Sequence, residues 1–147
     1  MRSKGMKLSR RHRGWFYASF SALFLSGLVW VILHYCAPSA LEPLALKIHG
    51  AAAMIVLILL GTLIPRHIKK GWQANLNRGS GSFMIATNVF LICSGYALYY
   101  AGGEWLRRAA SISHILIGIL FPVFLVWHIV TGRRERKKMA RLRKYSL

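Results

Sequence analysis

Four long stretches without a charged residue dominate this chain of 147 residues. They cover residues 15–35, 49–65, 83–100 and 109–132, and charged segments separate them. A helix needs about 17–25 apolar residues to cross a bilayer, and each stretch is close to that length. A soluble bundle would need polar helix faces towards water, which these stretches do not offer. The sequence therefore predicts an all-α integral membrane protein, a four-helix up-and-down bundle.

The first stretch follows a basic leader, which is also how a signal peptide begins. Its apolar part has about 21 residues, against about 7–15 in a signal-peptide core, so we interpret it as an uncleaved span. The expected organisation is a basic arm at residues 1–14, a membrane domain at 15–132 and a basic tail at 133–147. The polar, Gly/Ser-rich segment at 69–82 is expected to be a flexible connector.

The net charge of +18 is distributed unevenly along the chain. Of the 21 lysines and arginines, all but Lys47, Arg107 and Arg108 lie before the first stretch, between the second and third, or after the fourth. Lysine and arginine accumulate in the cytoplasmic segments of membrane proteins, so both termini are expected in the cytoplasm. The charge is then a topology signal that also contacts anionic lipid, and nucleic-acid binding is not expected.

Histidines stand near the ends of the second and fourth stretches. The second begins at His49 and is followed by His67, and the fourth contains His114 and His128. The step from His114 to His128 is about 21 Å along a helix and ends about 40° short of four full turns, so these two histidines share one face. Ionisable residues in membrane spans are rare and usually functional. This spacing favours a helix that holds two haem irons, one near each membrane surface.

The outer haem is expected between His49 and His114. Both spans run from the outside to the inside, so the two imidazoles lie at one depth, and haem b takes one axial imidazole from each side. Small residues at 50–53 and Gly118, one turn after His114, would let a porphyrin approach the backbone. The competing interpretation is that small residues only allow close helix packing. His34 is interpreted as an interfacial residue or an alternative outer ligand.

The inner haem is expected on His128, with His67 or His12 as the second ligand. His67 follows His49 by five whole turns of a regular helix, so these two would share a face. That step is about 27 Å, some 6 Å longer than the step from His114 to His128, and Pro65 and helix tilt would have to absorb the difference. His12 lies among arginines at the start of the first span and is the alternative.

Other kinds of site fit these residues less well. None of the three acids, Glu42, Glu104 and Glu135, lies inside an apolar stretch. Zinc and di-iron sites need clustered carboxylates, cysteines or several close imidazoles, and pumps and ion transporters usually need buried carboxylates. The sequence has no C-x-x-C-H motif for covalent haem attachment. The expected cofactor is therefore non-covalent haem b.

At this point the chain resembles the small membrane-bound b-type cytochromes of bacteria, which include cytochrome b561 and the b subunits of formate dehydrogenase and nickel–iron hydrogenase. The resemblance covers roughly residues 15–132. It rests on the four spans, RHRGW at 11–15, IHG at 48–50, and the step from SH at 113–114 to WH at 127–128. In such proteins the last span gives one ligand to each of two haems. The resemblance implies His114 paired with His49 and His128 paired with His12 or His67, in a bacterial inner membrane.

The expected function is to carry electrons across the bilayer through two bis-histidine haems, between the quinone pool and a redox partner protein. Iron with two imidazoles has no open position, so we expect an electron-transfer protein or the cytochrome subunit of an oxidoreductase rather than a stand-alone enzyme. Two alternatives remain. One is a haem-free structural or assembly subunit with interfacial histidines. The other is a quinone-reactive subunit, for which Tyr96, Tyr99 and Tyr100 are weak candidates.

Overall fold

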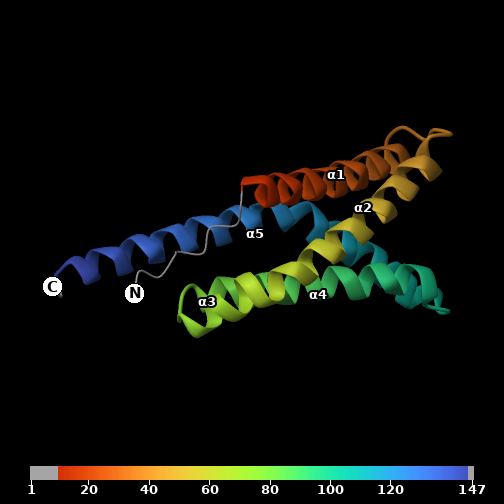
Figure 1. Cartoon of the computed structure of the whole chain (residues 1–147). Coiled ribbons are helices and arrows are strands. Elements are labelled where there is room, and N and C mark those ends of the chain that lie inside the picture. Colours follow the sequence, from red (N-terminus) through yellow and green to blue (C-terminus); the bar gives the residue numbers. More distant parts are fainter. Residues whose placement is uncertain (1–9, 146–147) are drawn as a thin grey trace. The chain divides into compact units, whose positions relative to one another are not determined.

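The computed structural model describes residues 10–145, and this part of the chain contains helices and no strand. The elements are α1 (Arg10–Tyr35), α2 (Glu42–Leu63), η1 (Ile64–Ile68), α3 (Lys69–Gln73), α4 (Arg78–Tyr100) and α5 (Glu104–Tyr145), as Figure 1 shows. Helices α1, α2, α4 and α5 are each long and apolar enough to cross a membrane. The chain is therefore an all-helical, multi-pass membrane protein, as predicted.

The chain divides into two compact units, which are residues 1–70 and 71–147. In the first unit α1 packs against α2, and in the second α4 packs against α5, each pair forming an antiparallel hairpin (Figure 1). Few residues of these helices are buried, and most of those are small or medium in size: Ser26, Ala45, Ala52, Val56, Ser80, Met84, Thr87, Ser94, Ala110 and Phe121. Small residues allow membrane helices to approach closely.

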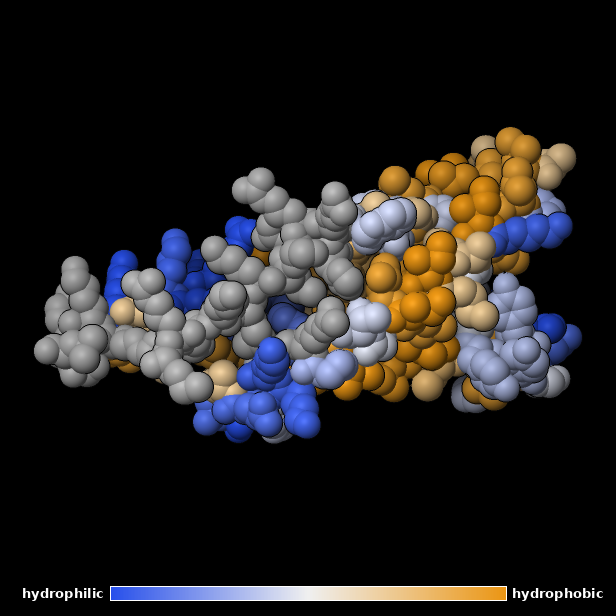
Figure 2. Space-filling view, in the orientation of Figure 1, coloured by the Kyte–Doolittle hydropathy of each residue, from blue (hydrophilic) through white to orange (hydrophobic). Residues whose placement is uncertain are grey.

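Large apolar side chains cover the outside of the helices. Leu25, Ile58, Val89, Leu116 and Val123 are examples, with 52–71% of each residue's surface exposed. Figure 2 shows this apolar surface in orange, next to blue basic segments. In a soluble protein such a surface would be a liability, whereas in a bilayer it faces lipid that is as apolar as the side chains themselves.

The second predicted span ends in a π-helix. Pro65 has no N–H, and its ring crowds the carbonyl four residues earlier, so an α-helix cannot continue through it unchanged. The Lys69 N–H instead bonds to the carbonyl of Ile64, five residues back. A π turn uses about one residue more than an α turn, which rotates the following residues by roughly 100°. The prediction that His67 shares the His49 face assumed a regular helix without this turn, so the face that His67 presents stays a prediction.

Most of the segment expected as a connector at residues 69–82 is helical, since α3 covers Lys69–Gln73 and α4 begins at Arg78. After α3, the chain turns at Asn75 and Asn77, whose φ angles of 52° and 53° lie in the left-handed region that asparagine tolerates. Arg78 donates hydrogen bonds of 3.1 and 2.6 Å to the Trp72 carbonyl and stacks on the Trp72 ring. The sequence GSGS at 79–82 then belongs to the start of α4.

Helix α5 is 42 residues long and continues through Pro122 and past Gly132 to Tyr145. The expected boundary between a membrane domain and a basic tail at 132–133 is therefore not marked by a break in the helix. In the same way, α1 begins at Arg10, upstream of the expected boundary at Trp15. Both basic segments extend a membrane-spanning helix beyond its apolar part.

Candidate functional site

In the second unit, His114 of α5 lies against Ser94 of α4. The His114 Nδ1 is 2.8 Å from Ser94 Oγ, and Ser94 is buried, with 7% of its surface exposed. The Ser94 hydroxyl also donates to the Leu91 carbonyl at 3.2 Å. A hydroxyl has a single proton. When Ser94 donates it to the Leu91 carbonyl, the Nδ1–H of His114 is the donor to Ser94 Oγ. In this tautomer Nε2 carries the lone pair, as an iron ligand requires.

His128 is held in a similar way at the start of α4. Its Nδ1 is 2.9 Å from the buried Ser80 Oγ and 3.4 Å from Asn77 Nδ2. Asn77 also donates to the His128 carbonyl at 3.2 Å, and Thr131 donates to Ser80 Oγ at 3.1 Å. Side chains of α4 and of the residue just before it thus fix both the ring and the backbone of His128.

The two serines of α4 match the two histidines of α5 in spacing. The step from Ser80 to Ser94 has the same length in sequence as the step from His114 to His128. Because the helices are antiparallel, α4 places a buried hydroxyl beside an imidazole at two depths about 21 Å apart. The histidines could be identified from the sequence, and the two serines, which were not expected, carry the same spacing in it.

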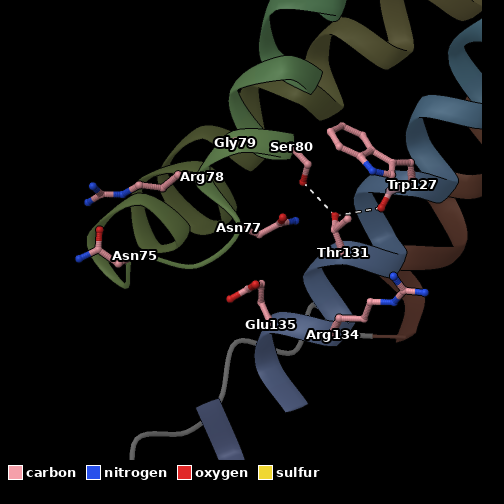
Figure 3. Close-up of a pocket in the computed structure, with 9 residues that line it drawn as sticks. All are labelled: Asn75, Asn77, Arg78, Gly79, Ser80, Trp127, Thr131, Arg134 and Glu135. Carbon is pink, nitrogen blue, oxygen red and sulfur yellow. Dashed lines mark hydrogen bonds between the residues drawn. The ribbon is translucent and has the colours of Figure 1, made fainter. Parts of the chain in front are cut away.

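A surface pocket of about 420 Å³ lies behind the hydrogen bonds to His128. It is lined by Asn75, Asn77, Arg78, Gly79, Ser80, Trp127, Thr131, Arg134 and Glu135. In Figure 3 the guanidinium groups of Arg78 and Arg134 point away from the space between the helices, and Ser80 and Thr131 are hydrogen-bonded to each other. The pocket therefore borders the residues that form hydrogen bonds with His128, and we assign no ligand to it.

In the first unit, His49 of α2 lies against α1. Its Nδ1 is 2.9 Å from the Leu23 carbonyl and 3.4 Å from Ser26 Oγ. A carbonyl can only accept, so Nδ1 carries the proton here too. A Cβ added at Gly27 would lie only 2.9 Å from the His49 ring, so the ring depends on glycine at this position.

His34 lies at the turn of the first hairpin, in a different environment. Its Nδ1 is 2.6 Å from the Glu42 carboxylate, and its ring stacks on Trp30 with centroids 4.8 Å apart. The side chain of His34 is 42% exposed. These contacts are those of an exposed residue in an ion pair, and the sequence analysis missed Glu42 as its partner.

The two candidates for the second inner ligand both belong to the first unit. His67 is half-buried within η1. His12 lies in the first turn of α1, and its side chain is outside the described part of the structure. The pairings of His49 with His114, and of His128 with His67 or His12, would each join the two units, and they stay predictions.

The donor groups fit a haem better than a bare metal ion. Within residues 10–145, no three His, Cys, Asp or Glu side chains gather as a metal ion would need. A haem iron needs only two axial imidazoles. An added Cβ at Gly118, one turn after His114, would meet no atom within 4 Å, so the helix surface there has room for a flat ring.

Fold and site together define a multi-pass helical membrane protein whose hairpins fix imidazoles through hydrogen bonds at Nδ1. Comparisons with models of protein families, with curated proteins and with solved structures find no match to this chain. The resemblance to small membrane b-type cytochromes therefore stays a prediction.

Proposed function

We propose that this protein is a membrane b-type cytochrome that carries electrons across the bilayer through two bis-histidine haems. One observation carries the proposal. Helix α5 holds two half-buried imidazoles, those of His114 and His128, on one face, and a buried serine of α4 contacts the Nδ1 of each. Metal-binding histidines almost always donate a hydrogen bond from the second ring nitrogen, which fixes the ring and raises its basicity. The Ser94 contact fits this arrangement when the Ser94 proton lies on the Leu91 carbonyl, whereas the Asn77 amide can only donate towards Nδ1 of His128.

His49 and His114 are the proposed ligands of the outer haem, and His128 with His67, or alternatively His12, the ligands of the inner haem. Haem b supplies the one-electron redox chemistry when bound, and the protein supplies ligation, orientation and burial. Two imidazoles occupy both axial positions of the iron, which suits electron transfer and disfavours oxygen chemistry. The lipid-facing exterior keeps water away from the imidazoles between the helices.

We further propose a bacterial inner membrane as the location, with both termini in the cytoplasm. The uneven distribution of lysine and arginine supports this orientation. Electrons would pass between the quinone pool and a redox partner protein. Helix α5 carries several cationic side chains beyond Gly132, so this end of the helix would bind an anionic lipid surface.

The test is a visible spectrum of the purified full-length protein in detergent. We expect a reduced-minus-oxidised spectrum of low-spin haem b, and two haems per chain by pyridine haemochrome. His114→Ala and His128→Ala should each remove one haem, and the double variant should be colourless. A wild-type protein that stays colourless after haem is added would contradict the proposal and favour the haem-free structural or assembly subunit.

A further inference from the structure

The two hairpins carry the same short motif on their first helices. The pattern Leu-x-x-Ser-Gly occurs at residues 23–27 in α1 and at 91–95 in α4. In each hairpin a histidine of the second helix lies on this motif, His49 in the first and His114 in the second. The sequence shows no repeat of fixed period because the histidine follows the serine by 23 residues in one hairpin and by 20 in the other.

The glycine of the motif lies directly under the imidazole. A Cβ added at Gly27 would be 2.9 Å from Cε1 of His49, and a Cβ added at Gly95 would be 3.4 Å from Cε1 of His114. The first distance is too short for a real contact, and the second is at the edge of ordinary van der Waals contact. Both imidazole rings therefore occupy space that a side chain would fill if the residue beneath them were not glycine.

The serine and a backbone carbonyl determine which ring nitrogen carries the proton. Ser26 Oγ donates to the Leu23 carbonyl at 3.0 Å, and Ser94 Oγ donates to the Leu91 carbonyl at 3.2 Å. With the single hydroxyl proton used in this way, each motif offers only acceptors to the ring beside it. His49 then donates from Nδ1 to the Leu23 carbonyl, and His114 donates from Nδ1 to Ser94 Oγ when the serine proton lies on the Leu91 carbonyl.

The two copies differ in the acceptor that the ring uses. The His49 Nδ1 is 2.9 Å from the Leu23 carbonyl itself and 3.4 Å from Ser26 Oγ. The His114 Nδ1 is 2.8 Å from Ser94 Oγ. Loss of the Ser26 hydroxyl would leave the main acceptor of His49 in place, whereas loss of the Ser94 hydroxyl would remove the acceptor of His114.

We infer that Leu-x-x-Ser-Gly is an imidazole-positioning motif, present twice, that holds His49 and His114 as Nδ1–H tautomers and makes each Nε2 a more basic ligand. The inference rests on the proposed function in that the metal is haem iron. The tautomer, however, is a property of the protein alone. Ser94 is a positioning residue in this scheme, because it acts through His114 and does not touch the iron.

The first experiment needs no cofactor. Full-length protein with ¹⁵N-labelled histidine is produced without haem, placed in lipid nanodiscs, and its imidazole tautomers are read by ¹⁵N NMR, with His49→Ala and His114→Ala assigning the signals. Wild type should show both rings as Nδ1–H. Ser94→Ala should lower the Nδ1–H fraction of His114, while the matched Ser26→Ala and the hydroxyl-retaining Ser94→Thr should not change it. An Nε2–H ring at His114 in the wild type would overturn the inference.

The second experiment uses the haem-loaded protein. A more basic ligand favours ferric iron, so Ser94→Ala should shift the midpoint potential of the outer haem upwards and weaken haem binding by about 10-fold. Ser82→Ala, which removes an exposed hydroxyl of α4 outside the motif, and Ser94→Thr should match the wild type. A Ser94→Ala protein that keeps two haems with wild-type potentials would overturn the inference and leave the cytochrome proposal intact. A wild-type protein without haem would end the cytochrome proposal, and the tautomers would still decide the role of the motif.

Discussion

The two hairpins are alike at one end and different at the other. Near the turn of each hairpin, a histidine of the second helix lies on a Leu-x-x-Ser-Gly motif of the first. At the opposite end, the second hairpin has His128 beside Ser80 and Asn77. The first hairpin has Leu63 at the corresponding position, as far after His49 as His128 is after His114. The proposed outer haem thus lies between equivalent ligands, and the proposed inner haem does not.

The second helix of the first hairpin changes geometry where the counterpart of His128 would stand. The helix passes from α to π at Ile64, and His67 follows within that π turn. Isolated π turns inside helices are often found at functional sites, where they redirect a side chain at some cost in helix stability. Helix α2 is therefore followed by an imidazole, that of His67, which is presented from a π turn and not from a regular α-helix.

Helix α1 of the first hairpin carries the other candidate for the second ligand of the inner haem, which is His12. His12 precedes Ser26 in α1 by the same step that separates Ser80 from Ser94 in α4. A histidine thus occupies the position at which the second hairpin has a supporting serine. One hairpin plan would then serve two roles, with a proposed ligand and its support in the second hairpin and a proposed ligand alone at this end of the first.

The largest expected effect tests whether the outer site is shared between the hairpins. His49→Ala and His114→Ala should each remove one haem, and the double variant should remove only that same haem, because bis-histidine ligation fails when either imidazole is lost. His128→Ala should remove the other. Pyridine haemochrome per chain gives the counts. Loss of both haems in the double variant would mean that the two histidines serve different irons.

The next prediction concerns the second ligand of the inner haem, for which His67 and His12 are the candidates. His67→Ala should remove the inner haem as completely as His128→Ala does, because the π turn fixes its direction and the residue is half-buried. His12→Ala should keep both haems. Spectra of the two variants at equal protein concentration provide the measurement. The opposite pattern would assign the inner ligand to α1 and leave the π turn as a structural response to Pro65 alone.

A smaller effect is expected from the support of His128. Ser80→Ala should weaken binding of the inner haem by about 10-fold and leave the outer haem unchanged, since a hydrogen bond to the second ring nitrogen typically contributes that much to metal affinity. Haem titration of the apoprotein measures it. The matched control is Ser82→Ala, an exposed serine in the same first turns of α4. Equal behaviour of the two variants would show that Ser80 only packs.

The glycines of the two motifs give a comparison of stability. Gly27→Ala places a Cβ 2.9 Å from the His49 ring, so ring or helix must move, and overpacking of this kind costs about 1–3 kcal/mol. Gly95→Ala places its Cβ 3.4 Å from His114 and should cost less than about 1 kcal/mol. Thermal unfolding of both variants in detergent is the measurement. A larger loss in Gly95→Ala would contradict the close approach at Gly27.

Most of the fold could be predicted from the sequence. A helix that crosses lipid must be long and apolar, and both properties can be seen directly in the residues. The two histidines of α5 could be predicted to share a face because that helix stays regular between them. For His67 the spacing argument is less direct, since the π turn at Ile64–Ile68 changes the rotation per residue and a spacing rule does not include it. The helical content of the connector was not predicted, because asparagine turns and a serine-rich helix start have the same composition as a linker.

The serines that hold the imidazoles were missed although helix α4 marks them in its own sequence. Its buried polar residues, Ser80, Thr87 and Ser94, follow one another at seven-residue steps and so share one face of an otherwise largely apolar helix. The step from Ser80 to Ser94 also equals the step from His114 to His128. Sites built between membrane helices are thus better sought as matched spacings on neighbouring spans than as motifs within one span.

The smallest expected effect concerns the ion pair between His34 and Glu42 at the turn of the first hairpin. Both side chains are partly exposed, at 42% and 31%, so solvent and salt screen the pair and it should contribute about 0.2–1 kcal/mol or less. Glu42→Gln should lower the unfolding temperature slightly at low salt and leave it unchanged at high salt, with both haems retained. Loss of a haem in this variant would make His34 part of the outer site, and the two hairpins would then differ at their turn ends as well.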